Sequence, residues 1–320
     1  MNLLGLHHIT AITDSAERNY QFMTEVLGMR LVKKTVNQDD IQTYHTFFAD
    51  DIASPGTDVT FFDFPQVPQG RSGTNEISRI GLRVPSDEAV RYYYQRLKDH
   101  QVEVSEPEDF NGALSLRFQE SDGQQYRIVS DEENVGVEAG FPWKEGPVPE
   151  EYAIYGLGPV EITVSYFDPF KQALQELYGF QVVEEGLNTA LLEVGEGGHG
   201  GQVYLINDPN GETGIQGSGE VHHVAFRVEN SDVLKQWIDR YNQLGVRHSG
   251  HVDRFYFEAL YARVGHILIE LSTDGPGFMV DEPYETLGES LSLPPFLEPK
   301  RDQIEAVVRP FDTHWRGGKA

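Results

Sequence analysis

The sequence predicts an α+β protein made of four βαβββ modules arranged in two tandem domains. Three observations lead to this prediction. Four segments of the chain each read as a strand, a helix and then further strands. Three of their helices are followed by a glycine that leads into the next strand, at Gly28, Gly179 and Gly245. The length of 320 residues is more than one core usually needs and suits two domains.

The elements of the four modules recur in the same order along the chain. The opening strands begin at residues 7, 77, 158 and 222. The helices are expected at about residues 15–27, 86–100, 169–177 and 231–244. The closing strands of the first, second and fourth modules are expected at residues 59–64, 125–129 and 266–273. This common order indicates that the modules are repeats of one structural unit.

A change in composition divides the chain between the second and third modules. Residues 132–152 are rich in Glu, Gly and Pro, which is typical of a linker. We therefore expect one domain over residues 1–131 and a second over 153–273, each with two modules. The tail, residues 274–320, is apolar in places and has a short helical stretch near 303–308. We expect it to pack on the body of the protein or on a partner subunit.

Composition and charge limit the classes of function. With 39% hydrophobic and 24% charged residues, the chain has the composition of a soluble globular protein. It has no apolar run near the ~20 residues of a membrane span and no secretory signal, so a cytoplasmic location is expected. The net charge of −26 argues against binding to nucleic acid or to an anionic membrane. Because the chain has no cysteine, a metal site must use nitrogen and oxygen ligands.

The dipeptide His-His occurs twice, each time at the start of an apolar strand. The two pairs are His7-His8 and His222-His223. Side chains alternate between the two faces of a strand. In the first strand His7 shares a face with apolar residues, and in the later strand His222 begins an apolar face suited to packing under a helix. We therefore expect His8 and His223 to face a more polar environment.

A carboxylate interrupts the last strand of the fourth module. Glu270 lies on the face opposite Ile269 and Leu271, and a carboxylate in so apolar a strand needs a partner. Together with His8 and His223 it gives two histidines and one carboxylate. This set is typical of the non-haem Fe(II) sites that keep open positions. The sequence thus predicts that these three residues bind Fe(II), with Mn(II) as an alternative because the same ligands suit several divalent ions.

These repeats and ligand-type residues resemble the vicinal oxygen chelate superfamily, which includes glyoxalase I, extradiol dioxygenases and antibiotic-resistance proteins. Residues 5–40, above all Leu-Val-Lys-Lys-Thr-Val-Asn at 31–37, resemble the ring-cleaving dioxygenases that act on hydroquinone-type substrates. The resemblance extends over nearly the whole chain. It implies cupped mixed β-sheets and an Fe(II)-dependent enzyme that uses O2 as co-substrate to open a hydroquinone- or catechol-type diol to an acyclic product. The implied partner is a small aromatic diol, and a homo-oligomer is left open.

The distribution of ligand-type residues indicates which modules form the site. The first strand of the third module has Glu161 at its pocket-facing position and no histidine, so the site must combine the first and fourth modules, as the resemblance also implies. The second and third modules then form a second cup, in which we expect Arg79 to pair with Glu161. The resemblance further places Arg254 and Tyr261 near the substrate and His7 nearby as an acid or base. A β-bulge would be needed to turn His7 towards the metal.

Two other functions stay open. A glyoxalase-type isomerase or lyase would share the fold without consuming O2, but such sites generally use four protein ligands. The closing strand of the first module has Phe62 and Asp63, and a shift of one residue in register would turn Asp63 inward as a fourth ligand. The other alternative is a non-catalytic protein that binds small aromatic molecules. The remaining histidines, among them His45, show no pairing that marks them as ligands.

Overall fold

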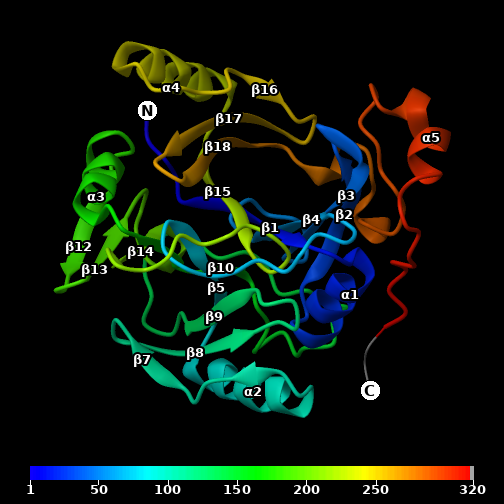
Figure 1. Ribbon diagram of the computed structural model, residues 1–320. Coiled ribbons are helices and arrows are strands. Elements are labelled where there is room, and N and C mark those ends of the chain that lie inside the picture. Colours follow the sequence, from blue (N-terminus) through cyan, green and yellow to red (C-terminus); the bar gives the residue numbers. More distant parts are fainter. Residues whose placement is uncertain (318–320) are drawn as a thin grey trace.

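The computed structural model describes residues 1–317, which form two large mixed sheets that each curl into a cup (Figure 1). The first sheet has the order β16 (Val252–Asp253), β17 (Phe257–Val264), β18 (Ile267–Pro276), β15 (Val221–Val228), β1 (Leu6–Thr13), β4 (Asp58–Asp63), β3 (Asp40–Ala49) and β2 (Arg30–Asn37). The main path of the second sheet is β12 (Gln181–Glu185), β13 (Thr189–Glu193), β14 (Gln202–Asn207), β11 (Val160–Val164), β5 (Glu76–Val84), β9 (Gln125–Ser130), β8 (Ala113–Gln119) and β6 (Glu103–Val104). Strand β10 (Gly156–Leu157) pairs with β5, and β7 (Glu108–Phe110) pairs with β8.

Each sheet combines one module from each half of the chain. The first and fourth modules meet where β1 pairs antiparallel with β15, and the second and third meet where β5 pairs with β11. In Figure 1 the blue strands of the first module therefore lie beside the yellow and orange strands of the fourth. The predicted α+β class with cupped mixed sheets is confirmed. Residues 132–152 contain neither helix nor strand, and the division into domains at this segment stays a prediction.

Every module has a helix that packs against its own strands. The α-helices are α1 (Ala16–Gln21), which continues as a π-helix over Phe22–Val26, α2 (Asp87–Asp99), α3 (Phe167–Glu176), α4 (Ser231–Leu244) and α5 (Arg301–Glu305) in the tail. Helix α4 shows the local causes clearly. The Asn230 side chain accepts hydrogen bonds from the first turn, and Gly245 with φ of +68° ends the helix. Its buried face, Leu234, Trp237 and Tyr241, has helical spacing.

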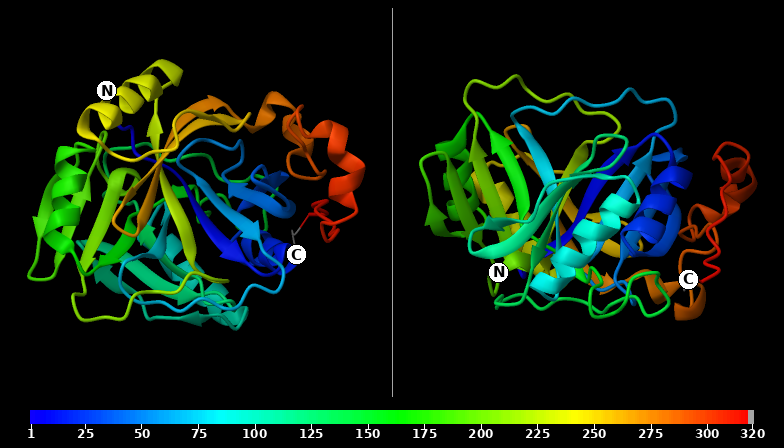
Figure 2. Two further views of the ribbon diagram at one scale, coloured as in Figure 1. Left: turned by 45° about the horizontal axis from the view of Figure 1, so that its top comes forward. Right: turned by 90° about the horizontal axis from the view of Figure 1, so that it is seen from below.

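The tail lies along one side of the molecule, against strands of the first module (Figure 2). The tail contains short 3-10 helices at Phe278–Val280, Tyr284–Thr286 and Glu298–Lys300. Outside the tail, a 3-10 helix at His199–Gly201 precedes β14. Leu293 and Ile304 of the tail are buried in one cluster with Val36 and Tyr44 of strands β2 and β3. The short helix predicted near residues 303–308 begins at Arg301 instead. Among the described residues, no helix combines the length and apolar character that crossing a membrane requires.

Candidate metal centre

The two central strands of the first sheet each contain a β-bulge at a His-His pair. The register between β1 and β15 shifts once between Leu6 and His8, which makes His7 the extra residue of β1. It shifts again after the pair formed by Thr10 and His223, which makes His222 the extra residue of β15. A bulge re-aims the neighbouring side chains. The second histidine of each pair thereby points into the cup.

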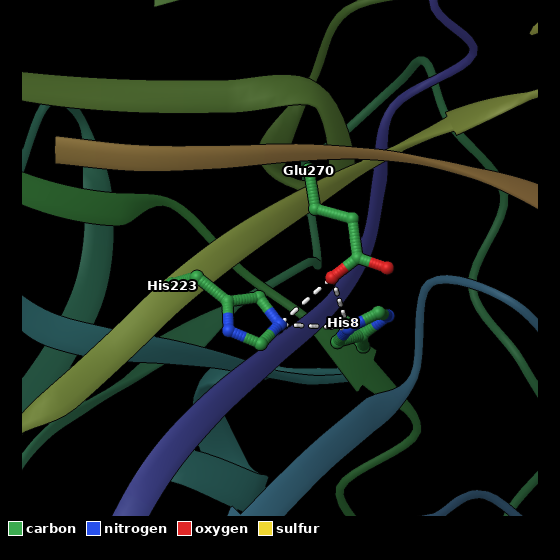
Figure 3. A group of neighbouring side chains, drawn as sticks. All are labelled: His8, His223 and Glu270. Carbon is green, nitrogen blue, oxygen red and sulfur yellow. Dashed lines mark hydrogen bonds and ion pairs between the residues drawn. The ribbon is translucent and has the colours of Figure 1, made fainter. Parts of the chain in front are cut away.

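His8 and His223 meet Glu270 from β18 at one point of the cup (Figure 3). The Nε2 atoms of the two histidines lie 3.2 Å apart. Oε2 of Glu270 lies 3.2 Å from Nε2 of His8 and 2.8 Å from Nε2 of His223. Ligand atoms bound at about 2.1 Å and at right angles around one cation lie about 3.0 Å apart. The three atoms therefore have the spacing of adjacent ligands on one face of an octahedral ion.

The hydrogen bonds around these atoms also suit a cation. Oε2 of Glu270 is buried and has no hydrogen-bond donor of suitable geometry among the described residues, whereas Oε1 accepts a hydrogen bond from Ser272 at 2.8 Å. Nδ1 of His8 lies 2.9 Å from Nδ1 of His7, and the corresponding distance from His223 to His222 is 2.8 Å. Hydrogen bonds at Nδ1 fix the orientation of each ring and leave Nε2 facing the common point. The donor set fits a divalent metal.

The charges of the three groups favour the same conclusion. Burial would raise the pKa of Glu270, but the adjacent His8 and His223 outweigh it and hold that pKa well below its ordinary value. Burial lowers the pKa of His223, and the adjacent carboxylate of Glu270 only partly opposes the shift. At neutral pH the site therefore presents an ionised carboxylate beside neutral His223. These are the forms that bind metal ions.

A cavity of about 550 Å³ opens above the three residues. Its walls are largely aromatic and come from both modules of the sheet. They include Phe47, Phe62, Phe64, Tyr256, Phe257 and Tyr261. Polar residues Asn37, Gln38, Asp39, Ser249 and Arg254 also line it. The volume is in the range of small-molecule sites, for which about 300–1,000 Å³ is usual.

The structure brings Arg254 and Tyr261 to this cavity and places His7 behind it. Nε of Arg254 donates a hydrogen bond to the Tyr261 hydroxyl at 3.3 Å, and its Nη2 lies 2.8 Å from Asp39. Burial, and then the charge of Glu270, raise the pKa of Tyr261 well above its ordinary value. His7 is buried between His8 and the carbonyl of Thr273, which lies 3.1 Å from its Nε2. The catalytic roles of these three residues stay predictions.

Two histidines that were not predicted to lie at the site line the cavity. The prediction that His222 packs under a helix is wrong, because the bulge turns it to the cavity wall, where its ring meets Phe62. His45 was not distinguished by the sequence, yet it lies half-buried beside the site with Nε2 2.9 Å from Oγ1 of Thr60. The alternation of His45 with Phe47 along β3 was the available signal, since residues two apart share a face.

The first module supplies no fourth carboxylate. Glu270 pairs with Ala225, two residues after His223. The matching position in the first module is Thr60, which pairs with Thr10, two residues after His8. Phe62 lines the cavity, whereas Asp63 lies 2.6 Å from Nη2 of Arg309 in the tail. The possibility that Asp63 turns inward is therefore wrong.

The second cup contains an ion-pair network at the corresponding places. Arg79 pairs with the buried carboxylate of Glu161, as predicted. Nε of Arg127 donates to the other oxygen of Glu161 at 2.8 Å, and Nη1 of Arg127 donates to Ser115 at the same distance. Both oxygens of Glu161 are thus occupied by guanidinium groups. This cup already holds its own cations.

Comparison with known proteins places the chain in a family. The family model described as the Glyoxalase/Bleomycin resistance protein/Dioxygenase superfamily matches residues 5–128. The chain is 45% identical to "Putative ring-cleaving dioxygenase MhqA" of Bacillus subtilis, over 97% of this chain and 100% of that protein. It is 30% identical to "Chlorohydroquinone/hydroquinone 1,2-dioxygenase" of Sphingobium indicum, over 94% of each chain.

A solved structure agrees with this grouping. The crystal structure of a "putative dioxygenase" from Bacillus subtilis superposes with a TM-score of 0.89 at 34% identity, covering 97% of this chain and 98% of that one. The similarity thus includes both cups and the tail rather than one module. The chain belongs to the Glyoxalase/Bleomycin resistance protein/Dioxygenase superfamily, and within it to the family of the relatives that are named ring-cleaving dioxygenases.

Proposed function

We propose that the protein is an Fe(II)-dependent dioxygenase that inserts O2 into a hydroquinone- or catechol-type aromatic diol and opens the ring to an acyclic product. The observation that carries the proposal is the convergence of His8, His223 and Glu270 at the base of an aromatic cavity. The names of the relatives support it, because one of them is a chlorohydroquinone/hydroquinone dioxygenase. Mn(II) is the alternative metal. A cytoplasmic location and self-association stay predictions from the sequence.

The three ligand residues would hold the metal by one face. Bound there, Fe(II) would supply a Lewis acid with open positions for a diol hydroxyl and O2. The protein contributes the orientation of the ligands, because His7 and His222 hydrogen-bond to the rings of His8 and His223. We therefore assign His7 a role that acts through His8. Any proton that it exchanges with the substrate would have to pass by way of that ring.

The cavity walls would bind and orient the aromatic ring. Phe62 and Phe257 line the space beside the ligands, and Phe257 packs against His8 with a ring-centroid distance of 5.4 Å. Aromatic side chains suit a flat apolar ring and exclude water from the reacting atoms. His45 adds a neutral imidazole, since burial lowers its pKa well below the ordinary value. One face of the substrate would thus meet aromatic walls while its hydroxyl meets the metal.

Tyr261 would donate a proton to the substrate, and Arg254 would stabilise negative charge on it. A tyrosine hydroxyl is protonated at neutral pH, and the raised pKa of Tyr261 keeps it so, which leaves a proton for donation to an oxygen of the substrate. Arg254 donates to the same hydroxyl oxygen and stays cationic. A fixed cation stabilises negative charge that develops on the opening ring. The pair can therefore act as one unit on the side of the cavity next to Glu270.

Oxygen uptake by protein that has been reconstituted anaerobically with Fe(II) tests the proposal. Hydroquinone, methylhydroquinone and catechol are offered in parallel, with Mn(II)-loaded protein as a second arm and metal-free protein to subtract autoxidation. We expect Fe(II)-dependent uptake, together with a ring-opened product identified by mass spectrometry. If stoichiometric metal binds but no diol consumes O2, the dioxygenase proposal fails and an oxygen-independent isomerase or lyase takes its place.

A further inference from the structure

A strained turn carries three residues of the cavity wall. Between β16 and β17, Phe255 has φ of +69°, in the left-handed region that bulky side chains rarely adopt. Arg254, Tyr256 and Phe257 surround it in sequence and all line the cavity. Within the turn, the N–H of Phe255 donates to Asp253 at 2.7 Å. Such a conformation persists only where the surroundings hold it in place.

The segment that follows β18 holds this turn from behind. We call residues 277–292 the strap. The N–H of Gly277 donates to the carbonyl oxygen of Tyr256 at 2.8 Å, and the Tyr256 hydroxyl donates to Asp281 at 3.0 Å. The ring of Phe278 packs 5.4 Å from that of Tyr256 and 4.7 Å from that of Phe47, another residue of the cavity wall. The strap thus contacts the turn through its backbone, a hydroxyl and a ring.

One buried lysine of β2 fastens the strap. Lys33 has 0% of its surface exposed, and its Nζ donates to Asp281 at 2.7 Å and also to Glu282. The same ammonium group lies 4.8 Å from the centre of the Tyr256 ring. A buried ammonium is costly unless it is paired, and here both of its carboxylate partners belong to the strap. Without Lys33, the side chains of Asp281 and Glu282, which are 21% and 11% exposed, would lose the cation that they share.

We propose that Lys33 is a positioning residue for the active site. It fixes the strap, and the strap fixes the strained turn, so that Arg254, Tyr256 and Phe257 keep the shape that receives the substrate. Lys33 does not itself line the cavity, so its effect must pass through the strap and the ring of Tyr256. The identity of the substrate rests on the proposed function, whereas the contacts that fix the turn do not.

The neighbouring lysine is a matched control. Nζ of Lys34 donates to the carbonyl oxygen of Phe311 at 2.7 Å and lies 4.3 Å from the centre of its ring. It also lies within 3.5 Å of Oγ1 of Thr313. Lys34 therefore fastens a later part of the tail, and neither of these partners lines the cavity. The two side chains lie on one strand and bind different segments. The backbone carbonyl of Lys34 does accept a hydrogen bond from Ser292 of the strap, but a change of side chain leaves that contact in place.

The experiment compares Lys33→Met and Lys34→Met with the unmodified protein, all loaded with Fe(II). For Lys33→Met we expect unchanged iron content and a KM for the diol that rises on the order of tenfold or more, because a small displacement of positioning groups has a large effect. Amide hydrogen exchange should become faster at residues 253–262 and 277–292. For Lys34→Met we expect a KM within about twofold of the original and faster exchange only near residues 308–317.

Further variants and readouts separate the explanations. Lys33→Arg keeps the charge and should recover most of the lost affinity. Because Met fills nearly the same volume as Lys, the loss in Lys33→Met reports the missing charge. If Lys33→Met does not fold, Asp281→Asn removes one arm of the contact and should raise KM in the same direction. An unchanged KM in a folded Lys33→Met or Asp281→Asn protein, or unchanged exchange at residues 253–257, overturns the proposal. If the unmodified protein oxidises no diol, the proposed function fails, and the exchange data alone then decide the role of Lys33.

Discussion

The two cups share a topology but differ in how their central polar groups are satisfied. In the first cup, His8, His223 and Glu270 direct electron pairs at one point, and Oε2 of Glu270 has no hydrogen-bond donor among the described residues. In the second, Arg79 and Arg127 supply cations to both oxygens of Glu161. The first set has the donors to accept a cation from outside, whereas the second already contains its own cations.

The register of the modules makes the comparison specific. In three modules, the residue two positions after the site residue of the opening strand (His223, Arg79 or His8) pairs with a residue of the closing strand. In the fourth module this partner is Glu270, in the second it is Arg127, which pairs with Gly81, and in the first it is Thr60. The same position of the module is therefore occupied by a carboxylate, a guanidinium and a hydroxyl group in the three modules. Residue type at a few positions, and not the fold, decides whether a cup can hold a metal.

The largest expected effect is loss of activity when a ligand of the first cup is removed. His8→Ala, His223→Ala and Glu270→Ala should each lower turnover by more than about 100-fold, because even residues that only support metal ligands cost 10–100-fold when changed. Circular dichroism should show an intact fold, and elemental analysis should show loss of iron. Glu161→Gln in the second cup is the control and should keep its iron. Oxygen consumption retained by His8→Ala would remove that residue from the ligand set.

In the metal-free protein, a substitution in the second cup should cost more stability than one in the first cup. Glu161→Gln leaves Arg79 without its carboxylate and Arg127 with Glu108 alone, and breaking a buried pair in this way costs about 3–5 kcal/mol. Glu270→Gln removes a carboxylate whose neighbours are two imidazoles rather than two fixed guanidinium cations, so its cost should be smaller. Urea unfolding of both variants measures the free energies of unfolding. An equal or smaller cost for Glu161→Gln would contradict the view that the second cup satisfies itself.

A carboxylate at Thr60 should make the first cup resemble a four-ligand site. We expect Thr60→Glu to keep the metal but to lower Fe(II)-dependent oxygen uptake about tenfold or more, because an additional ligand fills a position that the reaction needs open. Thr60→Val is the control, since it removes only the hydroxyl that contacts Thr10 and His45. Full activity of Thr60→Glu would show that this position does not face the metal.

The smallest effect concerns a pair of carboxyl groups near the seam of the two sheets. Burial, and then the charge of Glu220, raise the pKa of Glu76 from 4.5 to about 8. Between these values the folded protein keeps a proton that the unfolded chain releases, so the contribution of Glu76 to stability is present below pH 4.5 and is lost as the pH rises to about 8. The free energy of unfolding should fall less over this interval in Glu76→Gln. Parallel curves for the two proteins would refute the shift. Glu212→Gln, an exposed glutamate on the facing loop, is the control.

Several features could be predicted because they depend on residues close in sequence. The modules follow from alternating apolar residues and from glycines after helices. Arg79 and Glu161 are far apart in the sequence, but each was assigned to the second cup from the alternation of side chains along its own strand. The wrong predictions concern His222 and Asp63, whose orientation depends on a bulge and on an ion pair with the tail. His45 and Lys33 were not distinguished at all. Their roles depend on neighbours far away in the sequence.

The sequence by itself determined the module type, the two His-His pairs and the lone carboxylate of the last strand, because side-chain chemistry and strand periodicity are local properties. Only the tertiary structure decided the geometry in which His8 and His223, 215 residues apart, meet, and that the strap closes behind Tyr256. The physical reason is that register between distant strands is set by the packing and hydrogen bonding of whole sheets. A single bulge there turns a side chain from the core to the site.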